Sequence, residues 1–282
     1  MTLFSLVSSP DRRRPARLSA ALAAAVIAAL AAGCSASGSG GSSTSASGGG
    51  QATSALQAIK LAAADSRTIN TMAMSLNEQF GTTTITGTIQ LRRDPLLMRD
   101  NLAVTTNGTT IDMSAIIDTS AYYLRIPQLS GVTGKPWVKI TLGQLSSKTG
   151  INLAQAFQQA QNMSPSSTTQ IFTASQDIHK VGTATINGIP TTEYAGTVTA
   201  AGAISRLPVA SRKQLASLLS SLGTSPVSFQ VWIDGNNVVR KAVENLTVAG
   251  QHAVVTSTVT AVNQPISITI PPASQTGTIP GL

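Results

Sequence analysis

The chain has 282 residues, of which 42% are hydrophobic, 4% aromatic and 11% charged. One cysteine excludes a disulfide-stapled miniprotein and a zinc site built on cysteines, and the hydrophobic fraction excludes a disordered chain. Part of the net charge of +8 lies at the N-terminus, because residues 1–17 carry four arginines and one aspartate, a net charge of +3. The remaining residues carry a net charge of +5.

The N-terminal residues have the layout of an export signal. After the arginines comes an uncharged run of fifteen residues, 18–32, rich in Ala and Leu, which ends at Gly33 and Cys34. This run is shorter than the ~20 residues that a transmembrane helix requires, so a signal peptide over residues 1–33 is favoured over a permanent span. A twin-arginine signal is an alternative that depends only on Arg12 and Arg13.

Residues 30–34, Leu-Ala-Ala-Gly-Cys, resemble a bacterial lipobox, although Ala31 stands where Leu is more common. The resemblance implies a lipoprotein with a diacylglyceryl thioether on Cys34, exported and anchored to the outer face of the cell membrane. Two acyl chains are enough for stable anchoring. The alternative for a lone cysteine is burial as a small hydrophobe, which does not suit a position before a Ser/Gly tract.

A flexible tether is predicted for residues 34–52, because thirteen of the sixteen residues from Ser35 to Gly50 are Ser or Gly. A tether of this length reaches about 25 Å, which would hold a domain just off a membrane surface. Residues 53–272 are long enough for one large β-rich domain. Residues 273–282 are interpreted as a C-terminal tail.

The first half of the domain begins with a predicted helix at 54–66, whose apolar residues recur at helical spacing. The apolar period then changes to two, which predicts antiparallel strands. Asn107-Gly108 and Asn187-Gly188 each predict a tight hairpin turn, because both residues tolerate positive φ. The alternating residues of the first strand pair are Met72, Met74, Leu76 and Phe80, followed by Ile85, Ile89 and Leu91.

Two further amphipathic helices are predicted at 151–161 and 208–222. A meander of strands is expected from Val227 to Ile233, Val238 to Val248, Ala253 to Val262 and Pro265 to Ile270. Many strands with three amphipathic helices indicate an α+β domain. We expect a strongly curved antiparallel sheet with helices packed on its concave face, and the pattern leaves open whether the interior is a filled core or a hydrophobic cavity.

Motifs for catalysis are nearly absent. The two histidines, His179 and His252, are isolated in the sequence and are interpreted as exposed turn residues. We therefore predict no enzyme activity, no metal site and no cofactor. The aspartates near predicted turns are interpreted as solvated; they are Asp94, Asp100, Asp112 and Asp118.

The basic residues of the domain fall into two groups, near the turn at Asp94-Pro95 and at the start of the helix predicted at 208–222. A nucleic-acid partner is not expected, because no stacking aromatics are interleaved with these charges. They form either a solvated face or a contact with anionic lipid headgroups. The residues are Arg92, Arg93, Arg99, Arg206, Arg212 and Lys213.

A series of short motifs runs through the domain: Ala121-Tyr122-Tyr123, Pro136-Trp137-Val138-Lys139, Val181-Gly182, Tyr194-Ala195-Gly196, Val231-Trp232-Ile233-Asp234, Val239-Arg240-Lys241, Pro265-Ile266 and Ile270-Pro271-Pro272. Their order and spacing resemble the LppX/LprG-type bacterial lipoproteins, which are relatives in fold of the LolA lipoprotein carriers. The resemblance covers about residues 53–272. It implies an open half-barrel around a cavity that takes up acyl chains of lipids or glycolipids and moves them across the cell envelope. Cys34 is the functional position that transfers directly.

The resulting hypothesis is a membrane-anchored, non-enzymatic lipid-binding protein, with an envelope protein as a further possible partner. Two alternatives are a tethered structural module with a filled core, and a lipid-modifying hydrolase that would place a serine beside a histidine. Methionines on the inward side favour a compliant cavity. The predicted cavity walls are Met72, Met74, Leu76, Ile89, Leu91, Leu153, Phe157, Leu215, Leu218, Leu219, Phe229, Val231 and Ile233.

Overall fold

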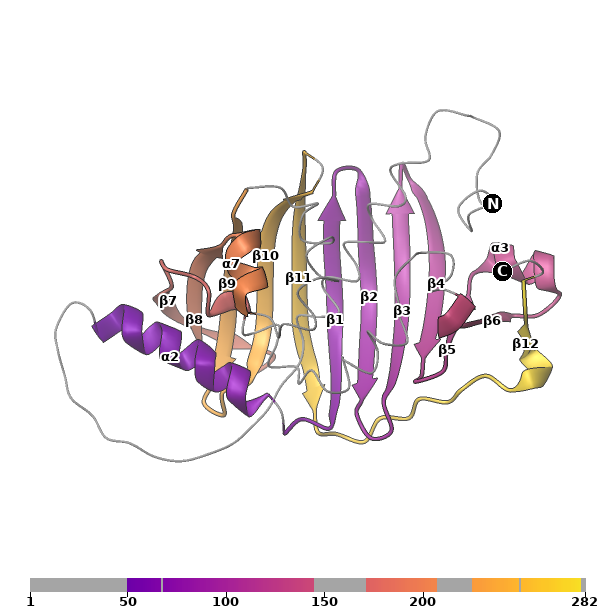
Figure 1. Ribbon diagram of the computed structural model, residues 1–282, viewed down its shortest axis with the longest axis horizontal. Coiled ribbons are helices and arrows are strands. Elements are labelled where there is room, and N and C mark those ends of the chain that lie inside the picture. The colour runs from indigo at the N-terminus through magenta and orange to yellow at the C-terminus, as the bar shows by residue number, and fades with distance from the viewer. Residues whose placement is uncertain (1–49, 67, 145–170, 207–224, 249, 280–282) are drawn as a thin grey trace.

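The computed structural model describes residues 50–66, 68–144, 171–206, 225–248 and 250–279. Within these ranges most of the regular structure belongs to one sheet (Figure 1). The strands are β1 (Thr71–Phe80), β2 (Thr83–Arg92), β3 (Leu97–Thr106), β4 (Thr109–Ile117), β5 (Ala121–Arg125), β6 (Trp137–Thr141), β7 (His179–Ile186), β8 (Ile189–Val198), β9 (Val227–Asp234), β10 (Val239–Val248), β11 (Gln251–Val262) and β12 (Thr276–Gly277). The helices are α2 (Gly50–Asp65), α3 (Pro127–Thr133), α7 (Ala200–Arg206) and the short 3₁₀ turn η2 (Ala273–Gln275).

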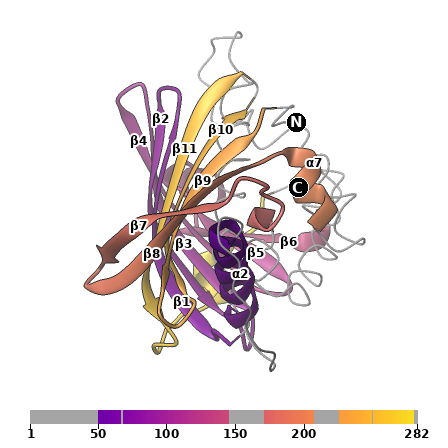
Figure 2. The same cartoon turned by 90° about the vertical axis from the view of Figure 1, so that its left-hand side faces the viewer.

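The strand order is β12-β6-β5-β4-β3-β2-β1-β11-β10-β9-β8-β7. All neighbours are antiparallel except β12, which runs parallel to β6. Since β1 pairs with β11, the two ends of the domain meet in the middle of the sheet. Figure 2 shows that the sheet is open and curved and that α2 and α7 lie on the side toward which it curves, here called the concave face.

The sequence patterns explain most of these strands. In β1, buried positions alternate with more exposed ones from Met72 to Phe80, as a period of two requires. Both predicted Asn-Gly turns occur, and their residues have positive φ, from 49° at Asn187 to 79° at Gly188. The prediction of a helix at 54–66 is confirmed by α2, which begins at Gly50 and so includes the last residues of the segment 34–52 predicted as a tether.

The expectation of a strand at Pro265–Ile270 is wrong, because no strand forms there. Instead the segment leaves β11 and reaches the far edge of the sheet, where β12 pairs with β6 (Figure 1). On its way Ile268 packs beside Leu97 and Tyr123, on the face opposite Met72. Both neighbour positions beside β11 are already filled by β1 and β10, so the alternating segment cannot pair with the strand that precedes it.

The packed domain also continues past Pro272. Residues 276 and 277 form β12, and Ile279, 9% exposed, belongs to a buried cluster with Leu124 and Val138. The segment 273–282 therefore contributes to the fold at least as far as Ile279. The helices predicted at 151–161 and 208–222 lie outside the described residues.

Candidate functional site

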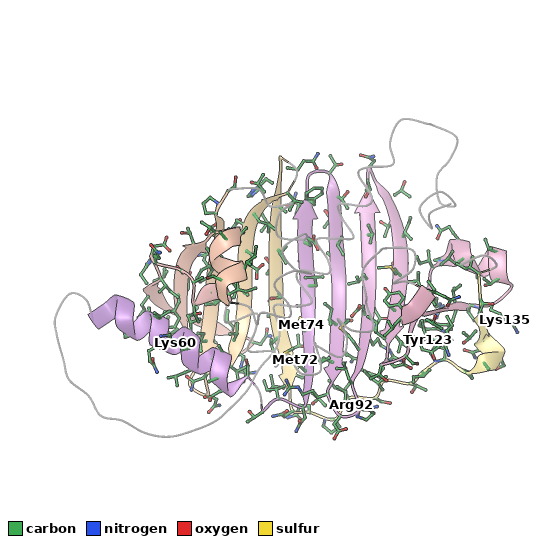
Figure 3. All side chains as sticks on the ribbon, in the orientation of Figure 1. Lys60, Met72, Met74, Arg92, Tyr123 and Lys135 are labelled. Carbon is green, nitrogen blue, oxygen red and sulfur yellow. The ribbon has the colours of Figure 1, made fainter. Side chains whose placement is uncertain are left out.

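The concave face carries a continuous apolar surface over its middle strands. Strand register places Met74 beside Ile89 and Val259, so these side chains stand on one face of three adjacent strands. Figure 3 labels Met72 and Met74 on β1 near the centre of the sheet. We call this surface the central cluster; its buried members are Ile69, Met72, Met74, Leu76, Phe80, Ile85, Ile89, Leu102, Leu246, Val248, Ala253, Val255 and Val259.

A second cluster lies beside it on the same face and is covered by a helix. Ile59 of α2 is fully buried in it, and Phe172 packs against Phe229 with ring centroids 4.4 Å apart. We call this the lateral cluster; its buried members are Ala55, Ile59, Ala62, Phe172, Ile178, Phe229, Val231, Ile233 and Ala242. By contrast, no described helix contributes a side chain to the central cluster.

The predicted cavity-wall residues that the structure describes are divided between the central and lateral clusters. Met72, Met74, Leu76 and Ile89 are 2–5% exposed and belong to the central cluster, and Leu91 packs against it. Phe229, Val231 and Ile233 belong to the lateral cluster, which also contains Ala55, Ile59 and Ala62 of α2. The remaining five lie outside the described residues: Leu153, Phe157, Leu215, Leu218 and Leu219.

Three carboxyl groups stand on the same apolar face, and none of them was predicted as a site residue from the sequence. Glu78 is 0% exposed, and neither of its carboxylate oxygens has a hydrogen-bond partner in the described structure. Burial raises the pKa of Glu78 to about 7, with a further contribution from Glu244. Burial also raises the pKa of Glu244 and that of Asp100 to about 7.

The interpretation of Asp100 as a solvated turn residue is wrong. It is the fourth residue of β3 and pairs with Ile89 and Ala115, and its Oδ1 is buried without a partner. Burial and the Asp100 carboxylate together raise the pKa of Tyr122, which also stands on this face. The alternation of β1 could have revealed Glu78, because it occupies the inward position between Leu76 and Phe80.

An open pocket of about 530 Å³ adjoins the central cluster where β1 begins and β11 ends. Two of its charged side chains are paired within the protein. Asp65 accepts a hydrogen bond of 2.6 Å from Asn237, and Arg240 forms an ion pair of 2.7 Å with Asp234. Three apolar residues, Ile69, Val238 and Val262, belong both to the pocket lining and to the central cluster or its immediate packing. The pocket is therefore continuous with the apolar face.

The histidines lie at the strand starts where the sequence predicted exposed positions. His179 and His252 are both exposed. His179 Nδ1 lies 2.8 Å from the backbone carbonyl of Asp177, whereas the Asp177 carboxylate accepts hydrogen bonds from Ser175 and Thr197. Among the described residues, neither histidine is paired with both a serine hydroxyl and a carboxylate, so the hydrolase alternative gains no support from this geometry.

Comparisons with known proteins find similar chains but no matching family model. An uncharacterized 31.2 kDa protein from the rplA-rplJ intergenic region of Streptomyces griseus is 31% identical over 114 residues. That match covers 39% of this chain and 37% of the relative, so the chain is aligned with little more than a third of that protein.

Two solved mycobacterial structures align with most of this chain. The structure of Mycobacterium tuberculosis LppX is 14% identical, with 77% of this chain and 99% of LppX covered at a TM-score of 0.48. LprF from Mycobacterium bovis is 13% identical, with 78% and 98% covered at a TM-score of 0.49. The similarity concerns the fold alone.

Proposed function

We propose that the protein is a lipoprotein that binds acyl chains of lipids or glycolipids on the concave face and carries them across the cell envelope. The observation that supports this most directly is the central cluster, which joins apolar side chains from β1, β2, β3, β10 and β11 into one surface. Each methylene group that a ligand buries there would contribute ~0.8 kcal/mol. Such a surface favours long chains without specific contacts.

The absence of a described helix over the central cluster distinguishes it from the lateral cluster, where α2 fills the space. In the proposal, acyl chains lie against the central cluster. The flexible thioethers of Met72 and Met74 suit ligands of variable shape. The continuous pocket of about 530 Å³ forms one open end of this site.

Native mass spectrometry of the full chain, purified from a bacterial host, tests the binding step. We expect bound lipid in the spectrum and uptake of a fluorescent fatty acid by the delipidated chain. Replacing Met74 by Asp should abolish uptake, since it places a charge on the apolar face. Replacing the exposed Asp112 by Asn should leave uptake unchanged. If no lipid co-purifies and no fatty acid is taken up, the tethered structural module becomes the better interpretation.

Anchoring through Cys34 is a separate part of the proposal. None of the described helices is long and apolar enough to cross a membrane. Cys34 and the apolar run 18–32 lie outside the described residues. Support for the anchor comes from the resemblance of residues 30–34 to a lipobox. Replacing Cys34 by Ala should leave the domain folded but move it from the membrane fraction to the soluble fraction. Retention of this variant on membranes would contradict lipidation at Cys34.

A further inference from the structure

Glu78 and Glu244 form a pair of carboxyl groups on the apolar concave face. Glu78 of β1 lies opposite Val255 of β11, and Val255 lies opposite Glu244 of β10. The three residues therefore form one row across adjacent strands. Two strand spacings separate the two acidic residues, or about 10 Å between their backbones. Both side chains can thus reach the space above Val255 from opposite sides.

No counter-charge stands in the rows of the described sheet nearest this pair. On β1–β4, β10 and β11, the nearest concave positions lie in the row of Glu78 and in the adjoining rows of Leu76 and Phe80. None of these positions holds a Lys, Arg or His. Arg92, whose Nε is also buried without a partner, stands on the opposite face. Asp100 and Tyr122 are further titratable groups on the concave side, and neither supplies a positive charge.

A buried carboxylate with no partner is costly, because burial removes its hydration and nothing in the sheet replaces it. Glu78 is fully buried and unpartnered, and Glu244 is 8% exposed. The described residues contain no group of three metal-ligating side chains, so the pair does not belong to a metal cluster within them. A cation on a ligand would satisfy both acids, and an ammonium group offers up to three hydrogen-bond donors.

The position of the pair also suits an amphiphile. Glu78 is two residues from the end of β1. Along the same strand, Leu76, Met74 and Met72 extend the apolar surface from Glu78 toward the pocket. The distance along β1 from Glu78 to Met72 is about 20 Å, which matches a long alkyl chain. The charged and apolar parts of this face are therefore arranged in series along one strand.

We propose that Glu78 and Glu244 bind the ammonium group of a cationic amphiphile whose alkyl chain lies along Leu76, Met74 and Met72. This inference deepens the proposed function and depends on it, because it names the class of lipid that the apolar face selects.

The test compares dodecylamine with dodecanol, which has the same chain length but no charge. Binding of both to the delipidated full chain is measured by isothermal titration calorimetry at pH 8 and pH 5. An alkylamine remains protonated at both values, as a lysine does, whereas the two acids ionise as the pH rises through about 7. We expect the amine to bind about tenfold more tightly than the alcohol at pH 8, with the ratio near one at pH 5.

The Glu78→Gln/Glu244→Gln double variant should bind both compounds equally at both pH values. The matched control is Asp112→Asn, which removes an exposed carboxylate from β4 and should keep the wild-type preference. If the double variant does not fold, the pH dependence of the wild-type ratio and the single variant Glu244→Gln provide the same test.

The possible results separate the two proposals. Equal binding of amine and alcohol by the wild type at pH 8 would overturn the ammonium site but leave acyl-chain binding intact. An amine preference that persists in the double variant would also overturn it, because the charge would then be recognised elsewhere. Failure of both compounds to bind would overturn the proposed function, and the ammonium site with it.

Discussion

The central and lateral clusters lie side by side on one face of one sheet, yet they are built differently. In the lateral cluster α2 and the Phe172 segment pack onto β9 and β10. In the central cluster the described members come from strands and from Ile69, and the acids Glu78 and Asp100 stand among them. The same alternation of apolar residues thus serves as a helix-packing surface in one region and as the candidate ligand surface in the other.

Truncation of one large side chain in each cluster should show the largest contrast. Phe229→Ala removes a ring that is 1% exposed in the lateral cluster and should lower the free energy of unfolding by ~4 kcal/mol. Met74→Ala in the central cluster should cost ~3 kcal/mol. We expect bound lipid to reduce the loss for Met74→Ala only, as measured by urea unfolding with and without lipid. Equal losses under both conditions would make the central cluster an ordinary core.

The pH dependence of stability should identify the central cluster through its acids. The pKa of Glu78 is raised from 4.5 to about 7, so the folded protein retains this proton to a higher pH than the unfolded chain does. Its contribution to stability is therefore complete below about pH 4.5 and is lost as the pH rises through about 7.

Glu78→Gln should remove that loss and stabilise the protein by ~3 kcal/mol at pH 8, with little effect at pH 4. Urea unfolding of wild type and variant across this pH range measures the difference, with Asp112→Asn as a control that keeps the wild-type slope. Parallel curves for wild type and Glu78→Gln would show that the carboxyl group has a partner in solution.

Glycine substitutions should show a smaller contrast between the clusters. At Gly87, in the central strands, an added Cβ would lie 2.0 Å from the backbone oxygen of Asn101. At Gly196, beside the lateral cluster, the nearest atoms are the side chains of Ser175 at 2.6 Å and Phe229 at 2.9 Å. Backbone yields less than side chains, so Gly87→Ala should destabilise by ~3 kcal/mol and Gly196→Ala by ~1 kcal/mol.

Thermal unfolding of both glycine variants measures this difference. Gly182→Ala is the matched control, because an added Cβ there meets nothing within 4 Å and should change stability by less than ~1 kcal/mol. The reverse order, with Gly196→Ala the more damaging, would show that the lateral cluster is the more rigid of the two.

Local patterns in the sequence were enough to predict most of the described strands. Alternation marks the inward side of β1 from Met72 to Phe80, and the Asn-Gly pairs determine two hairpins through their tolerance of positive φ. These features depend on the backbone preferences of a few adjacent residues. For the same reason the apolar residues of the candidate face could be named in advance.

Only the tertiary structure decided which surface those residues share and what lies among them. Residues 265–270 alternate like a strand but remain unpaired, because pairing requires a free neighbour and β11 has none. Asp100 is polar in the sequence, yet its Oδ1 becomes buried where β3 pairs with Ile89 of β2 and Ala115 of β4. Burial and strand pairing are set by residues far apart in sequence, and no local pattern records them.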